Sequence, residues 1–132
     1  YSNNIIVDLW HKWVLITTVA GATTLFNATI GEIASTEHGI AFITDLHNEC
    51  ITIAKSEKIK VNDDDLAQQR RFLSDKKSTW SSSMRRDMVN KSKIECAHIF
   101  LELINIADKN NVECPSLKTV MINGEIYMRS LV

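Results

Sequence analysis

An uncharged stretch from Trp13 to Gly31 constrains the fold of this chain more than any other feature of its sequence. A run of this length is typical of a membrane-spanning helix or of a helix buried inside a protein. Threonines, an asparagine and two glycines dilute its hydrophobicity, and no cluster of Lys or Arg flanks it to set a membrane topology. We therefore predict no membrane partner and a central core helix over about residues 5–26, bent or broken at Gly21.

The composition indicates one globular domain that occupies residues 1–132. Hydrophobic residues make up 45% of the chain and charged residues 23%, and a chain of this length can bury a single core. The 16 acidic and 15 basic residues nearly cancel, and no basic stripe alternates with aromatic residues, so nucleic acid is not expected as a partner. The three cysteines are widely spaced and lack a CxxC pair, which favours a reducing, cytoplasmic location over a disulfide framework or a zinc ribbon.

Local start signals predict further helices around the central one. No β alternation of any length competes with them, so the predicted fold class is all-α, as a single domain of about six helices. In chain order the signals are a capping box at Thr29 and Glu32, an N-cap at Ser35-Thr36 for a helix to about Ser56, an N-cap at Asn62 for a helix to Leu73, an N-cap at Ser83 after a serine-rich loop for a short helix to Val89, a helix from Glu95 to Lys109, and Pro115 at the start of the last helix.

Lys12 is the first candidate for chemistry, because two tryptophans, Trp10 and Trp13, and several aliphatic residues surround it in the sequence. An ammonium group that is partly removed from water is a better proton donor at neutral pH. Asp8 stands one turn earlier, however, and an acid–base pair at i,i+4 on an exposed helix face explains the same residues. Spacing alone favours this surface pair.

Ser82 and Ser83 precede a predicted helix, where free backbone N–H groups and hydroxyls can bind an anion such as a carboxylate. A simple N-cap is the commoner use of a serine at this place. Glu95 begins a series of polar residues with helical spacing, which is typical of a face in contact with water. Taken separately, these residues favour structural roles.

Two metal arrangements fit the residue types but lack the spacing that they require. Glu95 and His98 match the Glu-x-x-His spacing of di-iron helical bundles, which need a second such motif that this sequence lacks. A zinc site from His47, Cys50, Cys96 and His98 would lack the usual short loops between ligands. We predict no metal, and we expect the histidines to be packing and surface residues.

In their order along the chain, Trp10-x-Lys12, Ser82-Ser83-Met84, Asp87 and Glu95 resemble the C-terminal domain of ketopantoate reductases (2-dehydropantoate 2-reductases). In that family a Trp-x-Lys opens the first helix, and a Ser-Ser-Met-x-x-Asp segment precedes a glutamate. The resemblance covers the whole chain. It implies the all-α fold of the 6-phosphogluconate dehydrogenase C-terminal-like domains.

The resemblance also implies an activity, namely NADPH-dependent reduction of a 2-oxo acid, with ketopantoate reduced to pantoate in pantothenate biosynthesis. It implies that Lys12 is the catalytic proton donor, that Ser83 binds the substrate, and that Glu95 orients the substrate hydroxyl and the cofactor. It leaves a homodimer open. The family's dinucleotide-binding domain has no counterpart here, since no Gly-x-Gly-x-x-Gly is present. We therefore expect this chain to be part of a longer enzyme and to be inactive by itself.

Three positions bear on how far the resemblance extends. Ile16 and Ala20 stand where the family has asparagines that line the substrate pocket. These replacements favour a different substrate, or a repurposed, non-catalytic relative that serves as a ligand-binding or dimerisation module. An unrelated helical interaction domain is the third alternative, because each motif is short. Glu49 matches a frequent family glutamate, and we predict a structural ion pair for it.

Overall fold

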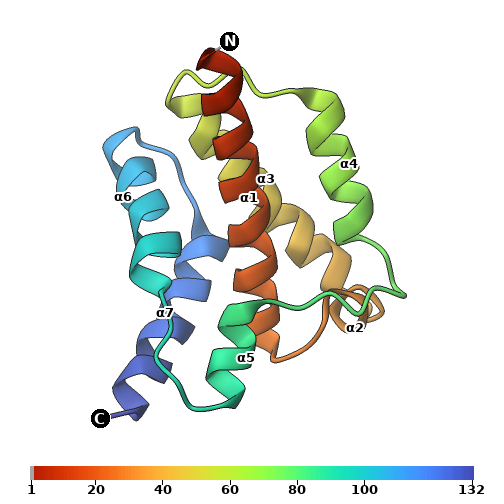
Figure 1. Cartoon of the computed structure of the whole chain (residues 1–132), viewed down its shortest axis with the longest axis vertical. Coiled ribbons are helices and arrows are strands. Elements are labelled where there is room, and N and C mark those ends of the chain that lie inside the picture. Colours follow the sequence, from red (N-terminus) through yellow and green to blue (C-terminus); the bar gives the residue numbers. More distant parts are fainter. Residues whose placement is uncertain (1) are drawn as a thin grey trace.

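The protein is an all-α domain in which six helices and a π-helical segment surround a long first helix (Figure 1). The computed structural model describes residues 2–132, and the side chains of all of these except residues 2, 3 and 97. No β-strand occurs within this range, which confirms the predicted fold class. The elements are α1 (Ser2–Phe26), α2 (Ile30–Ala34), α3 (Gly39–Ser56), α4 (Asp63–Leu73), α5 (Ser83–Val89), the π-helical η1 (Ala97–Leu101), α6 (Glu102–Lys109) and α7 (Pro115–Ser130).

The first helix is the central element, and α3, α7, α5, α2, α4 and η1 all pack against it. It is continuous through Gly21, so the predicted bend or break is wrong. A Cβ at Gly21 would lie 3.1 Å from Leu46 and 3.2 Å from Val120, which shows that this glycine allows α3 and α7 to approach closely. The C-terminal half of α1 is buried as predicted, whereas Ile5 and Leu9 in its N-terminal half are exposed.

Buried threonines explain how a helix with this composition can lie in a core. The hydroxyl groups of Thr18, Thr23 and Thr24 donate to the carbonyls of the residues four positions earlier, at 2.7–2.9 Å. Their polar atoms are therefore satisfied inside the helix itself. By length and composition alone the segment Asn4–Phe26 could also cross a membrane, but the buried core helix of a soluble protein meets the same criterion.

Of the first three predicted helix caps, two are present in the structure and one is not. Thr29 and Glu32 form the expected capping box, and the Asn62 side chain accepts from the Asp65 N–H at the start of α4. The cap predicted at Ser35-Thr36 is wrong, because these hydroxyls bond to carbonyls of the preceding helix and α3 begins at Gly39. A Cβ at Gly39 would meet the Ile33 carbonyl oxygen at 1.7 Å, so the tight turn between α2 and α3 requires glycine here.

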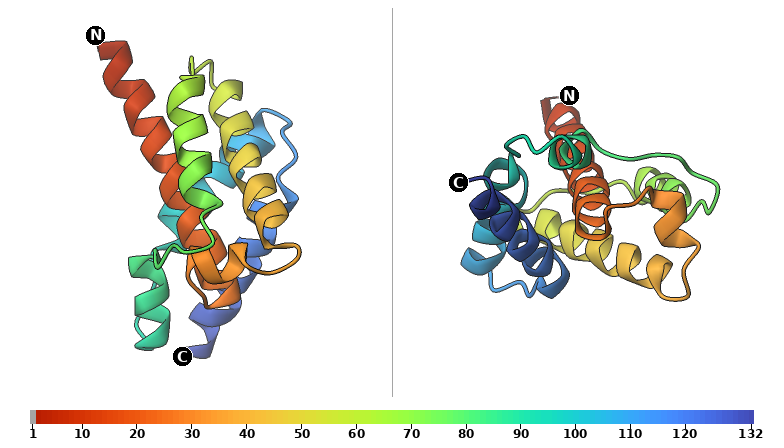
Figure 2. Two further views of the ribbon diagram at one scale, coloured as in Figure 1. Left: turned by 90° about the vertical axis from the view of Figure 1, so that its right-hand side faces the viewer. Right: turned by 90° about the horizontal axis from the view of Figure 1, so that it is seen from below.

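The segment 74–82 connects α4 to α5 and crosses α1 and α2, as predicted for a loop. Its backbone carbonyls at Ser78 and Trp80 accept from the N–H groups of Gly31 and Ile30, at 3.0 and 2.9 Å. The first N–H groups of α2 thereby find partners outside their own helix. This loop places α5 on the side of α1 opposite α3, as both views of Figure 2 show.

Candidate functional site

Lys12 lies on the exposed side of α1, and the rings of its sequence neighbours Trp10 and Trp13 form a tilted pair whose centroids are 5.0 Å apart. Its side chain is exposed, so the predicted partial removal from water is wrong. Within residues 2–132 no ion pair joins it to Asp8, so the alternative surface pair does not form either. The amine is free to meet a ligand.

One face of α1 carries Leu9, Lys12, Ile16, Val19 and Thr23, because these residues recur at intervals of three and four. Leu9, Lys12 and Ile16 are exposed, and Val19 and Thr23 are buried. The face is therefore open in its N-terminal part and covered in its C-terminal part. Val19 is covered by a core cluster that includes Ile30 and Leu73, and Thr23 contacts the serine-rich segment.

The hydroxyls of Ser82 and Thr23 lie 2.7 Å apart and form the bond that holds the start of α5 on this face. Ser82 also accepts from the Arg85 N–H, so Ser82 is the N-cap and the predicted cap at Ser83 is wrong. Ser83 is the first residue of the helix and is exposed. Lys12 and Thr23 are separated by about three helical turns, or ~16 Å along the axis.

Arg85 anchors α5 to the end of α1. Its guanidinium donates to the side chains of Asn27 and Ser81, at 3.1 and 3.2 Å, and it is half-buried. Arg86 is exposed. Arg85 therefore has a structural role.

Glu95 is exposed and directly precedes the helical segment that the sequence predicted to begin with it. Its carboxylate lies 3.8 Å from the ring of His98, in the face that contacts water. The following turn is π-helical, a rare geometry that is often found at functional sites. The indole N–H of Trp13 donates to the Ile99 carbonyl at 3.2 Å, which links the residue after Lys12 to this turn.

The start of α5 thus lies on the helix face that carries Lys12, and Glu95 precedes the turn that Trp13 contacts, but the three predicted site residues do not touch one another. No hydrogen bond or ion pair between Lys12, Ser83 and Glu95 occurs in the described part of the chain. Each is exposed. Their positions depend on bonds made by neighbouring residues, namely Thr23 with Ser82 and Trp13 with Ile99. The sequence spacing could have shown only that Thr23 shares a helix face with Lys12.

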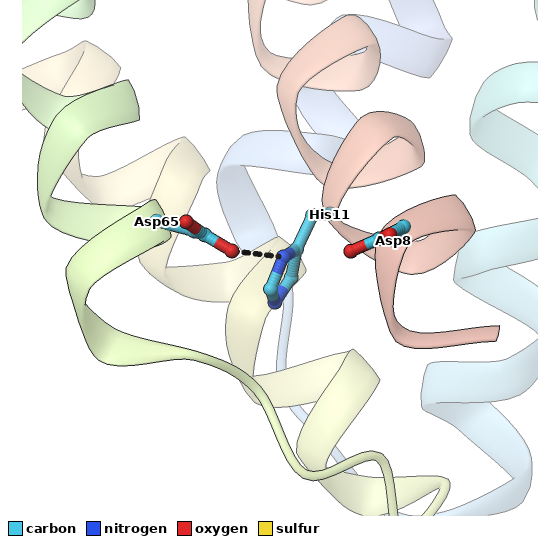
Figure 3. A group of neighbouring side chains, drawn as sticks. All are labelled: Asp8, His11 and Asp65. Atoms are coloured by element: carbon cyan, nitrogen blue, oxygen red, sulfur yellow. Dashed lines mark ion pairs between the residues drawn. The ribbon is translucent and has the colours of Figure 1, made fainter. Parts of the chain in front are cut away.

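A second polar group, which the sequence analysis missed, lies between α1 and α4 (Figure 3). The carboxylate of Asp65 is 3.5 Å from the Nδ1 atom of buried His11, and Asp8 lies on the other side of the ring. The Nε2 atom of His11 accepts from the Asn62 N–H at 3.1 Å, so the hydrogen of the neutral ring is on Nδ1. A metal ion would need the Nδ1 lone pair and a hydrogen on Nε2, which the Asn62 N–H opposes. The arrangement favours a structural contact over a metal site.

His47 is also part of a packing network. It is fully buried, and its ring bonds to Gln69 and Arg70, at 2.8 and 3.2 Å. Burial lowers the pKa of His47 to about 4. The neighbouring Cys50 is buried, and burial raises the pKa of its thiol, whereas zinc binds the thiolate. Of the four residues considered for a zinc site, these two are therefore used in packing and not prepared for a metal.

Glu49 has a different role from the predicted ion pair. Its two carboxylate oxygens accept from the backbone N–H groups of Ser116 and Leu117, at 3.0 and 2.9 Å. These N–H groups lie in the first turn of α7, which Pro115 begins as predicted. Glu49 thus caps a helix that is distant in sequence, where negative charge is favourable.

Two further observations limit what the described residues can bind. None of the four glycines has a positive φ, and each packs against other parts of the chain, so they form no cradle for a pyrophosphate. The residues present here do not fit a dinucleotide by themselves. A mainly apolar hollow of about 560 Å³ lies at the other end of α1, among Phe26, Ile33 and Phe42, and is remote from Lys12.

These features define the class of protein as a helical domain with an exposed lysine and a serine-capped short helix on one face of its central helix. The family model described as "Ketopantoate reductase PanE/ApbA C terminal" matches residues 4–123. The chain belongs to the ketopantoate reductase family, of which it represents the C-terminal domain.

Individual relatives agree with this assignment. The uncharacterized oxidoreductase YkpB of Bacillus subtilis is 32% identical over 126 residues, which cover 96% of this chain and 42% of that protein. The dimeric ketopantoate reductase of Staphylococcus aureus has the same fold, with a TM-score of 0.85, 17% identity, and coverage of 97% of this chain and 45% of that one. D-mandelate dehydrogenase with NADH and anilino(oxo)acetate matches with a TM-score of 0.81, 20% identity, and coverage of 97% and 42%. The chain therefore spans less than half the length of these proteins.

Proposed function

We propose that this chain is the substrate-binding and proton-donating helical domain of an NADPH-dependent reductase that converts a 2-oxo acid to a 2-hydroxy acid. Family membership supports the oxidoreductase class. The observation that carries the proposal is the Thr23–Ser82 bond, because it holds the start of α5 on the same face of α1 as Lys12, about three turns further along the helix.

In this proposal each predicted site residue has one task. Lys12 donates a proton to the carbonyl oxygen of the oxo acid as this oxygen becomes an alkoxide. The Ser83 hydroxyl binds the substrate, and Glu95 orients the hydroxyl group of the product. A reduced nicotinamide supplies the hydride in this class of reaction, and the part of the chain described here contributes binding and the proton.

The finer assignments are part of the same proposal. Reduction of 2-dehydropantoate to pantoate, a step of pantothenate biosynthesis, is the reaction that the family name carries. We propose NADPH as the reductant, although the D-mandelate dehydrogenase relative was solved with NADH. A homodimer is supported by the dimeric relative from Staphylococcus aureus, and a cytoplasmic location by the widely spaced, buried cysteines.

Replacement of Lys12 tests the central role. In the whole protein that carries this chain, Lys12→Ala should lower kcat for 2-oxo acids by ~10²–10⁴-fold, because it removes the general acid. NADPH oxidation, followed with a panel of 2-oxo acids, measures this effect. Lys55→Ala, an exposed lysine on α3, is the matched control and should retain the wild-type rate. Full turnover by Lys12→Ala would refute the proposed role.

A repurposed binding module is the second candidate. Its support is that Lys12, Ser83 and Glu95 make no direct contact and that apolar Leu9 and Ile16 flank the lysine on the exposed face. The same panel separates the two candidates: absence of turnover with every 2-oxo acid, in a correctly folded protein supplied with NADPH or NADH, would favour the binding module.

A further inference from the structure

We propose that a hollow at the C-terminal end of α1 is a binding site for a small organic phosphate. The hollow has a volume of about 380 Å³ and is lined by residues of α1, α5 and α7 and of the turns that follow α1 and α5. Both α5 and α7 lie at this end of α1 (Figure 1). Lys12, Ser83 and Glu95 do not line it, so the site is additional to the proposed reduction of a 2-oxo acid and does not depend on it.

The charge of this hollow is positive and has no counterion on its walls. Arg85 and Lys91 line it, and no Asp or Glu does. Neither cation forms an ion pair with any described side chain. The pKa of Glu32 is lowered, chiefly by the hydrogen bond from the Thr29 N–H, and the charge of Arg85 contributes least. The carboxylate of Glu32 is held by that N–H at 2.8 Å and lines a different hollow.

Arg85 is fixed in an orientation that leaves part of its guanidinium available. Its Nε and Nη1 atoms donate to Asn27 and Ser81, which are neutral acceptors, at 3.1 and 3.2 Å. Its Nη2 atom has no partner among the described residues. A guanidinium that is already ordered, and still has free N–H groups, loses little conformational entropy when it binds the oxygens of a phosphate.

Lys91 stands at a backbone position that favours glycine. Its φ is 59°, in the left-handed region, directly after the C-cap of α5. The turn is closed by the Ser92 N–H, which donates to the Asp87 carbonyl at 2.7 Å. Glycine would suit this backbone better. What lysine adds here is a positive charge at the rim of the hollow.

The remaining walls of the hollow suit an apolar group with a polar end. Leu25, Met88 and Val89 form its apolar part, and the side chains of Asn123 and Ser130 add polar atoms. The volume is within the range of small-molecule sites. Two cations match a phosphate monoester, which carries about −1.5 to −2 charges at neutral pH. An organic phosphate can therefore use both kinds of wall at once.

The first test is a titration of the whole protein that carries this chain with phenyl phosphate, which joins a phosphate to an apolar ring. Calorimetry should show binding that weakens as the NaCl concentration rises. Inorganic phosphate should bind more weakly, because it leaves the apolar wall without a contact. Phenol, which has the ring but no charge, should not bind.

Replacement of Lys91 locates the binding in this hollow. Lys91→Gly removes the charge and suits the backbone, so the protein should remain folded and the Kd for phenyl phosphate should rise about five- to tenfold. Lys58→Gly is the matched control. Lys58 also has a left-handed backbone, with a φ of 63°, follows α3 in the same way and is outside the hollow, so its variant should keep the wild-type Kd.

A second pair of variants adds a negative charge in place of removing a positive one. The Ser130 hydroxyl bonds only to a carbonyl of its own helix, and Ser130→Asp puts a carboxylate into the hollow. The Kd should rise by about tenfold or more, because the carboxylate repels the phosphate. Thr119→Asp makes the same kind of change at an exposed threonine of α7 outside the hollow, and it should leave the Kd unchanged.

Three results would overturn the proposal: no binding of phenyl phosphate by the wild type, equally tight binding of phenol, or the same Kd in the wild type, Lys91→Gly and Ser130→Asp. An equal rise of the Kd in Lys58→Gly would show a general effect of net charge and would contradict it as well. None of these results bears on the reduction of 2-oxo acids, which the kinetics of Lys12→Ala tests.

Discussion

His47 shows how burial decides what a polar residue can do. It offers one ring nitrogen to the Arg70 Nε–H and the other to the Gln69 side chain, in a fully buried position. Gln69 in turn donates to the His11 carbonyl at 2.9 Å, so these contacts join α3, α4 and α1. Each partner is satisfied only while the His47 ring stays neutral.

Stability should therefore depend on pH through His47. Its pKa is about 4 in the folded protein and 6.5 as the ordinary value, so the unfolded chain binds the proton more readily. The contribution of this residue is fully present above pH 6.5 and is lost as the pH falls toward 4, by about 3 kcal/mol in total. Urea unfolding between pH 4 and 7 measures it.

The matched variant for this prediction is His47→Gln, which keeps hydrogen-bonding groups but does not titrate. Its free energy of unfolding should vary less with pH over this interval than that of the wild type. Parallel curves for the two proteins would show that His47 does not cause the dependence.

At the scale of helices, the starts and ends that depend on adjacent residues are predictable, and those that depend on distant ones are not. The capping box at Thr29 and the cap at Asn62 involve partners three residues away, and both were predicted correctly. The partners of Glu49 are 67 and 68 residues distant, and sequence spacing gives no sign of them. The π-helical turn after Glu95 could not be predicted either, because the expected pattern assumes the periodicity of an α-helix.

Removal of the Glu49 charge should weaken the attachment of α7. Glu49→Gln keeps one oxygen for the Ser116 and Leu117 N–H groups but loses the second acceptor and the charge, which should cost about 1–3 kcal/mol of unfolding free energy. Chemical unfolding gives this value. Glu113→Gln, at an exposed position close to the same helix start, should change stability far less. Equal losses in the two variants would contradict the capping role.

The bond between Trp13 and Ile99 predicts a kinetic effect without a large structural one. Trp13→Phe keeps an aromatic ring but leaves the Ile99 carbonyl without its donor, at a cost of about 1 kcal/mol. Because this bond links the turns that carry Lys12 and Glu95, we expect a lower kcat with little change in KM. Steady-state kinetics of the whole protein measures both constants.

Trp10→Phe is the control for this variant, since it leaves the Trp13–Ile99 bond in place. A comparable fall in kcat in both variants would indicate a general effect of the ring pair. An unchanged kcat in Trp13→Phe would show that the bond does not position the catalytic groups.

For the whole molecule, the sequence was sufficient for the fold class, but not for the relative positions of the candidate site residues. An uncharged run with threonines at intervals predicts a buried helix, and α1 is buried over its C-terminal half. The environment of Lys12 was predicted wrongly, because flanking tryptophans in sequence point to other sides of a helix than the lysine does. Where Ser83 lies depends on the path of a loop, which no local pattern encodes.

That loop has a consequence for motion. Three hydrogen bonds hold it in place: the carbonyls of Ser78 and Trp80 accept from N–H groups of α2, and the Ser82 hydroxyl bonds to that of Thr23. The start of α5 is consequently held in place against α1 by bonds within this domain. If the proposed function holds, the serine-capped end of α5 would already be in position before a substrate binds, so that it need not be ordered by the ligand.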